Sequence, residues 1–205
     1  MCPSPDCGAV HAPTRYKVLV VDDEPTLRLG FSYALAEHEI DTAAGGQEAL
    51  EKIDAGGYDV VILDLRMPDV DGLQVIETLR EAGNLTPIVL CSAAVSPDAA
   101  LRAIRRQVVD FLLKPVCPAE LRGAIGGVLE PGDDPLSRAM VHARAGRIDD
   151  AIRGLGDEPG ESPRAAVWLA VLRGIRLGTA ESESKALSKL EREGLKHLAY
   201  RHPQG

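Results

Sequence analysis

The chain has 205 residues, of which 45% are hydrophobic and 26% charged, and its formal net charge is −8 at pH 7. This composition is typical of a folded protein and excludes a disordered chain, and the length suits one ordinary domain with a smaller one beside it. The acidic balance argues against a nucleic-acid-binding protein, because such proteins carry a basic excess that neutralises phosphates.

Residues 1–15 are rich in proline, cysteine and small residues and are predicted to be a flexible leader. Cys2 and Cys7, with His11 nearby, look like half of a zinc site, but a second CxxC pair is missing, so metal binding there stays an open question. The leader has no basic-then-apolar layout of a secretory signal, and no apolar run approaches the roughly 20 residues of a membrane span. We therefore expect a cytoplasmic protein without a membrane-bound part.

From residue 16 to residue 130, apolar runs of strand length alternate with segments of helical periodicity. The predicted strands cover residues 17–21, 40–43, 60–63, 87–91 and 108–113, and the predicted helices cover about 25–35, 46–55, 73–83, 97–106 and 118–129. Short apolar runs bounded by turn signals are typical of strands buried on both faces. Five such alternations predict a parallel sheet with helices on both faces, and right-handed crossovers fix most of its topology.

Polar and charged side chains stand where four of these strands end. Asp22 and Asp23 follow the first strand, Asp64 follows the third, and Ser92 and Lys114 follow the fourth and fifth. Because the carboxyl ends of parallel strands lie on one edge of the sheet, we expect these side chains to converge. Three carboxylates in one place repel one another, and a hard divalent ion such as Mg²⁺ would relieve that repulsion. With an ammonium and a hydroxyl beside them, the group suits phosphoryl transfer onto an aspartate.

Several segments together resemble the receiver domain of bacterial two-component response regulators. They are VVDDE at 20–24, DLRMPDVDG at 64–72, the strand-end Ser92, and DFLLKP at 110–115. The resemblance covers roughly residues 16–130 and implies a CheY-like, flavodoxin-like α/β fold, which is a doubly wound five-stranded parallel sheet in strand order 2-1-3-4-5. It also implies a phosphoacceptor switch rather than an enzyme, with at most autophosphorylation from phosphodonors and slow autodephosphorylation.

The resemblance assigns roles to the residues of the expected site. Asp64 would be the phosphoacceptor. Asp22, Asp23 and Asp64 would form the Mg²⁺ site, with Asp23 as the direct ligand and the backbone carbonyl of Arg66 as a further one. Lys114 would contact the phosphoryl group.

Two more residues would form the switch that responds to phosphorylation. Ser92 would turn inward, and Phe111 would be the aromatic side chain that follows it. Ser92 replaces the commoner threonine, Phe111 lacks the hydroxyl of the frequent tyrosine, and residues 108–109 replace a usual Gly-Ala pair. Simpler interpretations stay open for single residues, since Phe111 could be part of the core and Asp22 could only cap a helix.

The remaining residues, 131–205, are predicted to form a small all-α C-terminal domain that begins after the GDDP turn at 132–135. Helices are expected near residues 135–145, 148–155, 163–177 and 182–199. The segment ARAGRIDDAIRGL at 143–155 resembles part of a tetratricopeptide repeat, with Gly146 at the tight turn and Ala151 packed. A degraded second copy would place Ala186 35 residues after Ala151, close to the period of roughly 34 residues in such repeats. Fewer than three repeats are marginally stable, so we expect these helices to pack on the receiver-like part, on one another or on a partner.

Three functions follow as hypotheses. In the first, a sensor histidine kinase or phosphotransfer protein phosphorylates the chain, which then signals through an unknown protein partner of the helical tail. A homodimer through the fourth helix, fifth strand and fifth helix is a further implication of the resemblance. In the second, the chain is a transcriptional regulator whose tail binds DNA or recruits a DNA-binding partner. The third is a hydrolase of the haloacid-dehalogenase type, but Arg66 stands where that family usually has a second aspartate.

Overall fold

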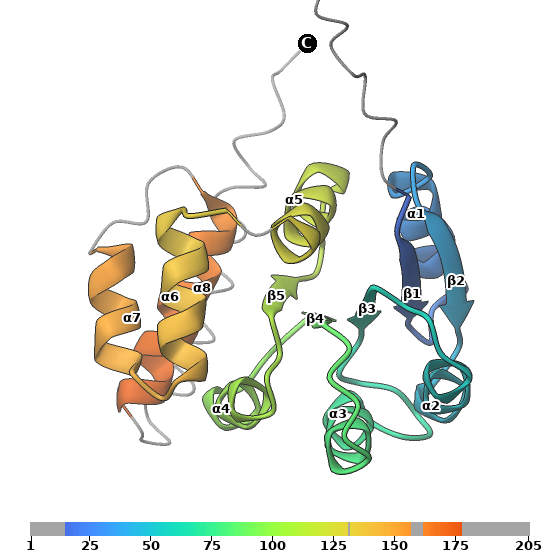
Figure 1. The fold of residues 1–205 in the computed structure, drawn as a ribbon, viewed down its shortest axis with the longest axis horizontal. Helices are drawn as coiled ribbons and strands as arrows, with labels where there is room; N and C mark the ends of the chain where they lie inside the picture. The colour runs from blue at the N-terminus through green and yellow to red at the C-terminus, as the bar shows by residue number, and fades with distance from the viewer. Residues whose placement is uncertain (1–14, 131, 157–161, 178–205) are drawn as a thin grey trace, which may run out of the picture.

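The computed structural model describes residues 15–130, 132–156 and 162–177 (Figure 1). Cys2, Cys7 and the helix expected at 182–199 lie outside the described residues. The strands are β1 (Lys17–Val21), β2 (Glu39–Ala43), β3 (Val60–Leu63), β4 (Ile88–Ser92) and β5 (Asp110–Leu113). The helices are α1 (Pro25–Ala34), α2 (Gly46–Ala55), α3 (Gly72–Glu81), α4 (Pro97–Arg105), α5 (Pro118–Leu129), α6 (Pro135–Arg144), α7 (Ile148–Leu155) and α8 (Pro163–Leu177).

The five strands form one parallel sheet in the order β2-β1-β3-β4-β5. Helices α1 and α5 cover one face, and α2, α3 and α4 cover the other (Figure 1). The predicted α/β fold and its strand order are therefore confirmed. The strands alternate their side chains between two apolar clusters, because Val18 and Val20 face α1 and α5, whereas Leu19 and Val21 face the opposite layer.

Local sequence signals set the ends of the helices. Proline occupies the first turn of α1, α4, α5 and α6, where its missing N–H group is not needed. The side chains of Asp71, Ser96 and Asp134 accept hydrogen bonds from backbone N–H groups at the starts of α3, α4 and α6. These signals explain why most predicted helix starts agree with the structure.

The fifth strand is shorter than the sequence indicates. Residues 108–109 were expected to open it, but β5 begins at Asp110. Helix α4 ends in a turn in which Gln107 has a φ of 61° and the Val108 N–H group donates to the Ala103 carbonyl at 3.0 Å. Val108 therefore completes the end of α4 and cannot extend the strand, although it is apolar and buried.

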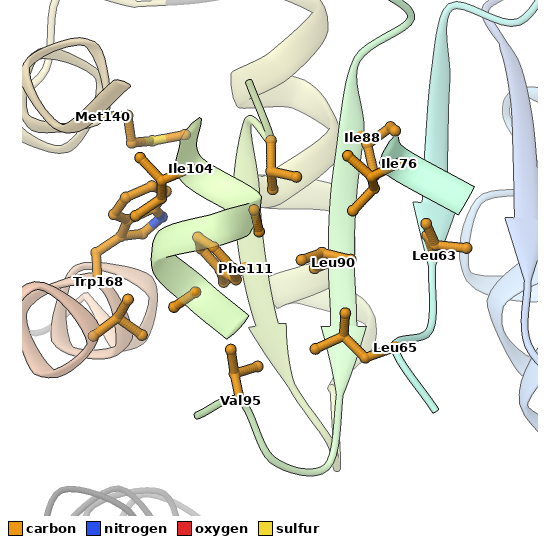
Figure 2. Close-up of a cluster of buried hydrophobic side chains, with 14 of the residues drawn as sticks. Leu63, Leu65, Ile76, Ile88, Leu90, Val95, Ile104, Phe111, Met140 and Trp168 are labelled. Atoms are coloured by element: carbon orange, nitrogen blue, oxygen red, sulfur yellow. The ribbon is translucent and has the colours of Figure 1, made fainter. Parts of the chain in front are cut away.

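The helices of the tail pack on the α/β part rather than apart from it. Figure 1 shows α6, α7 and α8 grouped beside the β5 edge of the sheet. Their buried side chains, including Met140 and Trp168, belong to the same apolar cluster as Leu90 and Phe111 of the sheet (Figure 2). Of the three arrangements that the sequence left open, the described residues show two, because the tail helices pack on the α/β part and also on one another.

The first half of the expected repeat has the local features that its sequence indicates. Gly146 lies between α6 and α7 with a φ of 77°, and Ala151 is fully buried. The degraded second copy falls outside the described residues, so the likeness to a tetratricopeptide repeat stays a prediction. No helix in the described ranges combines the length and the apolar character needed to cross a membrane.

Helix α8 contacts α4, β5 and α5 at once. These three elements form the surface through which the resemblance implies dimerisation. A homodimer built on that surface would first have to displace α8, because the same chain already covers it.

Candidate functional site

Three aspartates meet where β1 and β3 end. One side-chain oxygen from each of Asp22, Asp23 and Asp64 lies within 4.8 Å of the other two. Asp22 and Asp64 are buried, with 1% and 5% of their surface exposed, whereas Asp23 is exposed. The meeting follows from the sheet, because β1 and β3 are parallel neighbours that pair Val21 with Leu63, and the next residues leave the sheet side by side.

Lys114 joins two of these aspartates from the end of β5. Its Nζ lies 2.7 Å from Oδ2 of Asp22 and 3.1 Å from Oδ2 of Asp64, and 14% of its side chain is exposed. Burial acts to lower the pKa of Lys114, but the hydrogen bonds to the two carboxylates outweigh it and raise that pKa above its ordinary value. The ammonium therefore remains charged and offsets part of the repulsion between the acids.

The Oδ1 atoms of Asp22 and Asp64, which do not contact Lys114, have different environments. Oδ1 of Asp22 accepts a hydrogen bond from the backbone N–H of Glu24, the residue before α1, at 2.9 Å, while Oδ2 faces Lys114. Oδ1 of Asp64 is buried and has no hydrogen-bond partner among the described residues. A buried polar atom without a partner costs free energy, which points to a ligand at this position. Together with Asp23, the three acids present the oxygen donors that a hard cation such as Mg²⁺ prefers.

The loop after β3 is held at both of its ends. A Cβ atom added to Gly72 would lie 2.3 Å from the carbonyl oxygen of Asp64, so only glycine allows the loop to return this close. Asp69 accepts a hydrogen bond from the N–H of Gln47 at 3.0 Å, which fastens the loop to the start of α2, and Asp71 caps α3. The exposed Arg66 lies in this loop, two residues after Asp64, which puts its backbone next to the acid cluster along the chain.

Ser92 and Phe111, the two predicted switch residues, occupy different surroundings. Ser92 ends β4 on the same edge as the acids, is 1% exposed, and its Oγ donates to the carbonyl oxygen of Ala94 at 3.2 Å. Phe111 is fully buried, and its ring meets Trp168 of α8 edge to face with 5.1 Å between the ring centroids. In the resting protein Phe111 is therefore part of the core, the simpler of its two interpretations, because α8 covers this side of β5. Its role as a switch residue stays a prediction.

Cys91 lies one residue before Ser92 and packs in the cluster under α1 and α5. Burial raises the pKa of its thiol to about 12. The thiol is therefore protonated at neutral pH, and Cys91 packs as a small buried residue.

A family model for the response regulator receiver domain matches residues 18–126, which include the acid cluster, Ser92 and Lys114. The chain belongs to the receiver domain family. Receiver domains are phosphate-accepting switches rather than enzymes in the ordinary sense, and they interact with histidine kinases or phosphotransfer proteins. They bind Mg²⁺ through acidic residues, and Asp22, Asp23 and Asp64 form such a group in this receiver.

Curated relatives extend beyond the receiver. The two-component response regulator ORR21 of Oryza sativa subsp. indica is 32% identical over 157 residues, which are 75% of this chain and 22% of ORR21. The response regulator protein PilR of Pseudomonas aeruginosa is 30% identical over 154 residues, or 74% of this chain and 35% of PilR. The transcriptional regulatory protein TcrA of Mycobacterium tuberculosis is 32% identical over 135 residues, or 65% of this chain and 52% of TcrA. The chain thus spans about a fifth to a half of the length of these relatives.

Solved structures agree with the fold of the receiver. The chemotaxis protein CheY4 of Vibrio cholerae shares 32% identity with a TM-score of 0.54, covering 57% of this chain and 100% of CheY4. The signal receiver domain of the response regulator NarL of Mycobacterium tuberculosis shares 33% identity with a TM-score of 0.53, covering 58% of this chain and 100% of that domain.

Sequence reasoning missed a second group of polar residues, at the other end of β5. Asp110 is fully buried and is bound by Arg164 and Trp168 of α8. One signal was available, because an aspartate at the start of an otherwise apolar strand is expected to have a partner. No local pattern indicates that partner, since Arg164 and Trp168 lie more than fifty positions further along the chain.

Proposed function

We propose that this receiver accepts a phosphoryl group on Asp64 and signals through its helical tail. The observation that carries the proposal is the state of the two Asp64 oxygens. Oδ2 is held by Lys114 at 3.1 Å, whereas Oδ1 is buried without a partner in the described part of the chain. An oriented carboxylate with one uncommitted oxygen is suited to attack the phosphorus of a phosphohistidine or of a small phosphodonor. An O–P bond forms at Asp64 as the bond from phosphorus to the histidine nitrogen, or to the leaving oxygen of the small donor, breaks.

Asp22, Asp23 and Asp64, with the backbone carbonyl of Arg66, would hold Mg²⁺. When bound, Mg²⁺ neutralises charge on phosphoryl oxygens during transfer. The residues of the chain have separate tasks. Lys114 would keep Asp64 oriented before transfer and then contact the phosphoryl group, which its retained positive charge allows.

Ser92 would donate its hydroxyl hydrogen to the phosphoryl group. In the resting protein this hydroxyl donates to the carbonyl of Ala94 at 3.2 Å, which is long for a bond of this kind and is therefore exchanged at small cost. The loop between β4 and α4 would then follow Ser92. Such an event biases a two-state element near the site, as other phosphorylation switches do.

The phosphodonor in the cell would be a sensor histidine kinase or a phosphotransfer protein, and the output would be a protein partner of the tail. A second candidate is transcriptional control, in which the tail binds DNA or recruits a DNA-binding protein. It is favoured by the names of relatives such as TcrA and the alginate biosynthesis transcriptional regulatory protein AlgB. The net charge of −8 speaks against direct contact with DNA. Binding to mixed duplex DNA that weakens with added salt would support this second candidate.

The test is phosphoryl uptake from acetyl phosphate in the presence of Mg²⁺, followed by intact mass. We expect one phosphoryl group on the wild type and none on Asp64→Asn. Asp54→Asn, which removes an exposed carboxylate from α2, is the matched control and should be labelled like the wild type. Equal labelling of Asp64→Asn, or no uptake by the wild type, would reject the proposal. Steady turnover of a phosphate ester would instead indicate a hydrolase.

A further inference from the structure

The first residue of β5 is a carboxylate buried completely inside the molecule. Within the described residues, the hydrogen bonds to the Asp110 side chain come from its own strand and from α8. Oδ1 accepts from the Phe111 backbone N–H at 2.8 Å and from Nε1 of Trp168 at 2.6 Å. Oδ2 accepts from Nε of Arg164 at 2.9 Å and also from Nη2 of the same guanidinium. Two residues of the tail therefore satisfy a charge that belongs to the sheet.

The same two residues also join the other elements of this surface. Nη1 of Arg164 donates to the Gly123 carbonyl of α5 at 2.7 Å. Trp168 is fully buried and, in Figure 2, its ring lies next to Ile104 of α4, Met140 of α6 and the ring of Phe111. Arg164 and Trp168 thus tie α8 to α4, β5 and α5 at a single place.

An ion pair inside a core is a costly way to attach a helix. Burial raises the pKa of Asp110 above its ordinary value, although the nearby Arg164 charge and the Trp168 hydrogen bond act to lower it. Apolar residues of similar volume stabilise a contact about as well, whereas a buried carboxylate requires its partner in one geometry. The docking of α8 therefore depends on the contact between Arg164 and Asp110. A small displacement of either residue would weaken this ion pair.

Strand β5 connects this attachment to the acid cluster. It carries Asp110 at its first position, Phe111 at its second, and Lys114 directly after its last residue. The Lys114 N–H donates to the Ser92 carbonyl at 2.9 Å, and Val95, in the loop after Ser92, packs in the same apolar cluster as Phe111 and Trp168. A rearrangement of Ser92 and Lys114 around a phosphoryl group would therefore be transmitted to the contact between Phe111 and Trp168, because only a few residues separate the two places.

We propose that Asp110, Arg164 and Trp168 form a latch that holds α6–α8 over the α4–β5–α5 surface, and that a phosphoryl group on Asp64 loosens it. This coupling rests on the proposed function, whereas the latch itself does not. The packing of Phe111 and Trp168 explains why the phosphoryl group should loosen the latch rather than tighten it. Phe111 and Trp168 are each 0% exposed in the resting state. Because they are already fully packed, any displacement of Phe111 or α4 can only weaken the contact with Trp168.

Tryptophan fluorescence of the full chain measures this directly, because Trp168 is its single tryptophan. We expect the resting wild type to show blue-shifted emission and weak quenching by acrylamide. Beryllofluoride with Mg²⁺, which mimics the phosphoryl group, should shift the emission to the red and raise the quenching constant. Asp64→Asn should not respond to beryllofluoride.

Two substitutions on α8 test the latch without any phosphoryl group. Arg164→Gln keeps much of the side-chain length but removes the charge, and we expect it to raise the quenching of Trp168 in the resting protein. Arg176→Gln is the matched control, because Arg176 lies near the end of the same helix in an exposed pair with Asp149 at 3.8 Å. It should behave like the wild type.

The outcomes separate the two ideas. If acetyl phosphate labels the wild type but beryllofluoride leaves Trp168 fluorescence unchanged, the coupling is refuted and the proposed function stands. If Arg164→Gln matches the wild type in the resting state, the latch is refuted. If the wild type takes up no phosphoryl group, the proposed function fails, and the Arg164→Gln measurement still decides whether the latch exists.

Discussion

Replacement of Lys114 by methionine tests whether the ammonium compensates the buried acids. The substitution keeps a long unbranched side chain but removes the charge that lies 2.7 Å from Asp22 and 3.1 Å from Asp64. Two almost fully buried carboxylates would then lack their cation. Removing one partner of a buried ion pair costs about 3–5 kcal/mol, and we expect about 3 kcal/mol here because 14% of the lysine side chain is exposed.

Urea unfolding in the presence of EDTA measures this cost. With a slope of about 2 kcal/mol per molar urea, a loss of about 3 kcal/mol lowers the unfolding midpoint by about 1.5 M. Lys52→Met is the matched control, because Lys52 pairs with Glu48 in a partly exposed (i, i+4) arrangement and should lose less than about 1 kcal/mol. Mg²⁺ should restore more stability to Lys114→Met than it adds to the wild type, since the ion would supply the missing positive charge.

The result that would refute this reasoning is an unfolding midpoint of Lys114→Met in EDTA equal to that of the wild type. It would mean that water compensates Asp22 and Asp64 as well as the ammonium does. A midpoint shift that Mg²⁺ does not reduce would retain the ion pair but contradict a cation site formed by the three aspartates.

Two further predictions concern the turn after α4 and the tyrosine near β2. Gln107→Gly should stabilise the protein by about 0.5–1 kcal/mol, because glycine adopts a φ of 61° without the strain that a side chain adds. Gln107→Ala, the control, should not stabilise the protein. A lower urea midpoint for the glycine variant than for the wild type would contradict the turn geometry. Burial and the hydrogen bond from its hydroxyl to Asp41 raise the pKa of Tyr58 to about 12. Its contribution to stability is therefore complete below the unfolded value of about 10 and is lost as the pH rises through about 12. In an alkaline absorbance titration, Tyr58→Phe should remove the phenolate signal that develops last, and a wild type without a late component would show that this bond is absent.

The sequence alone determined the layout of the α/β part. The strand runs at 17–21 and 60–63 agree with β1 and β3 residue for residue. After Lys17 at the start of β1 both strands are apolar, as burial on both faces requires. The sequence also predicted which charged residues meet at the carboxyl ends of the strands. Asp22, Asp64 and Lys114 each follow a strand directly, and parallel pairing brings such positions together wherever the connecting helices run.

Tertiary structure alone decided what lies against β5. Nothing local in PRAAVWLAVL at 163–172 indicates that Arg164 and Trp168 enclose Asp110, because the partners of a buried charge are chosen by packing between distant segments. The same packing buries Phe111 against Trp168, whereas the sequence left a switch residue and a core residue as alternatives. Sequence patterns report which side chains must leave water, whereas the surface that receives each one depends on how complete layers fit together.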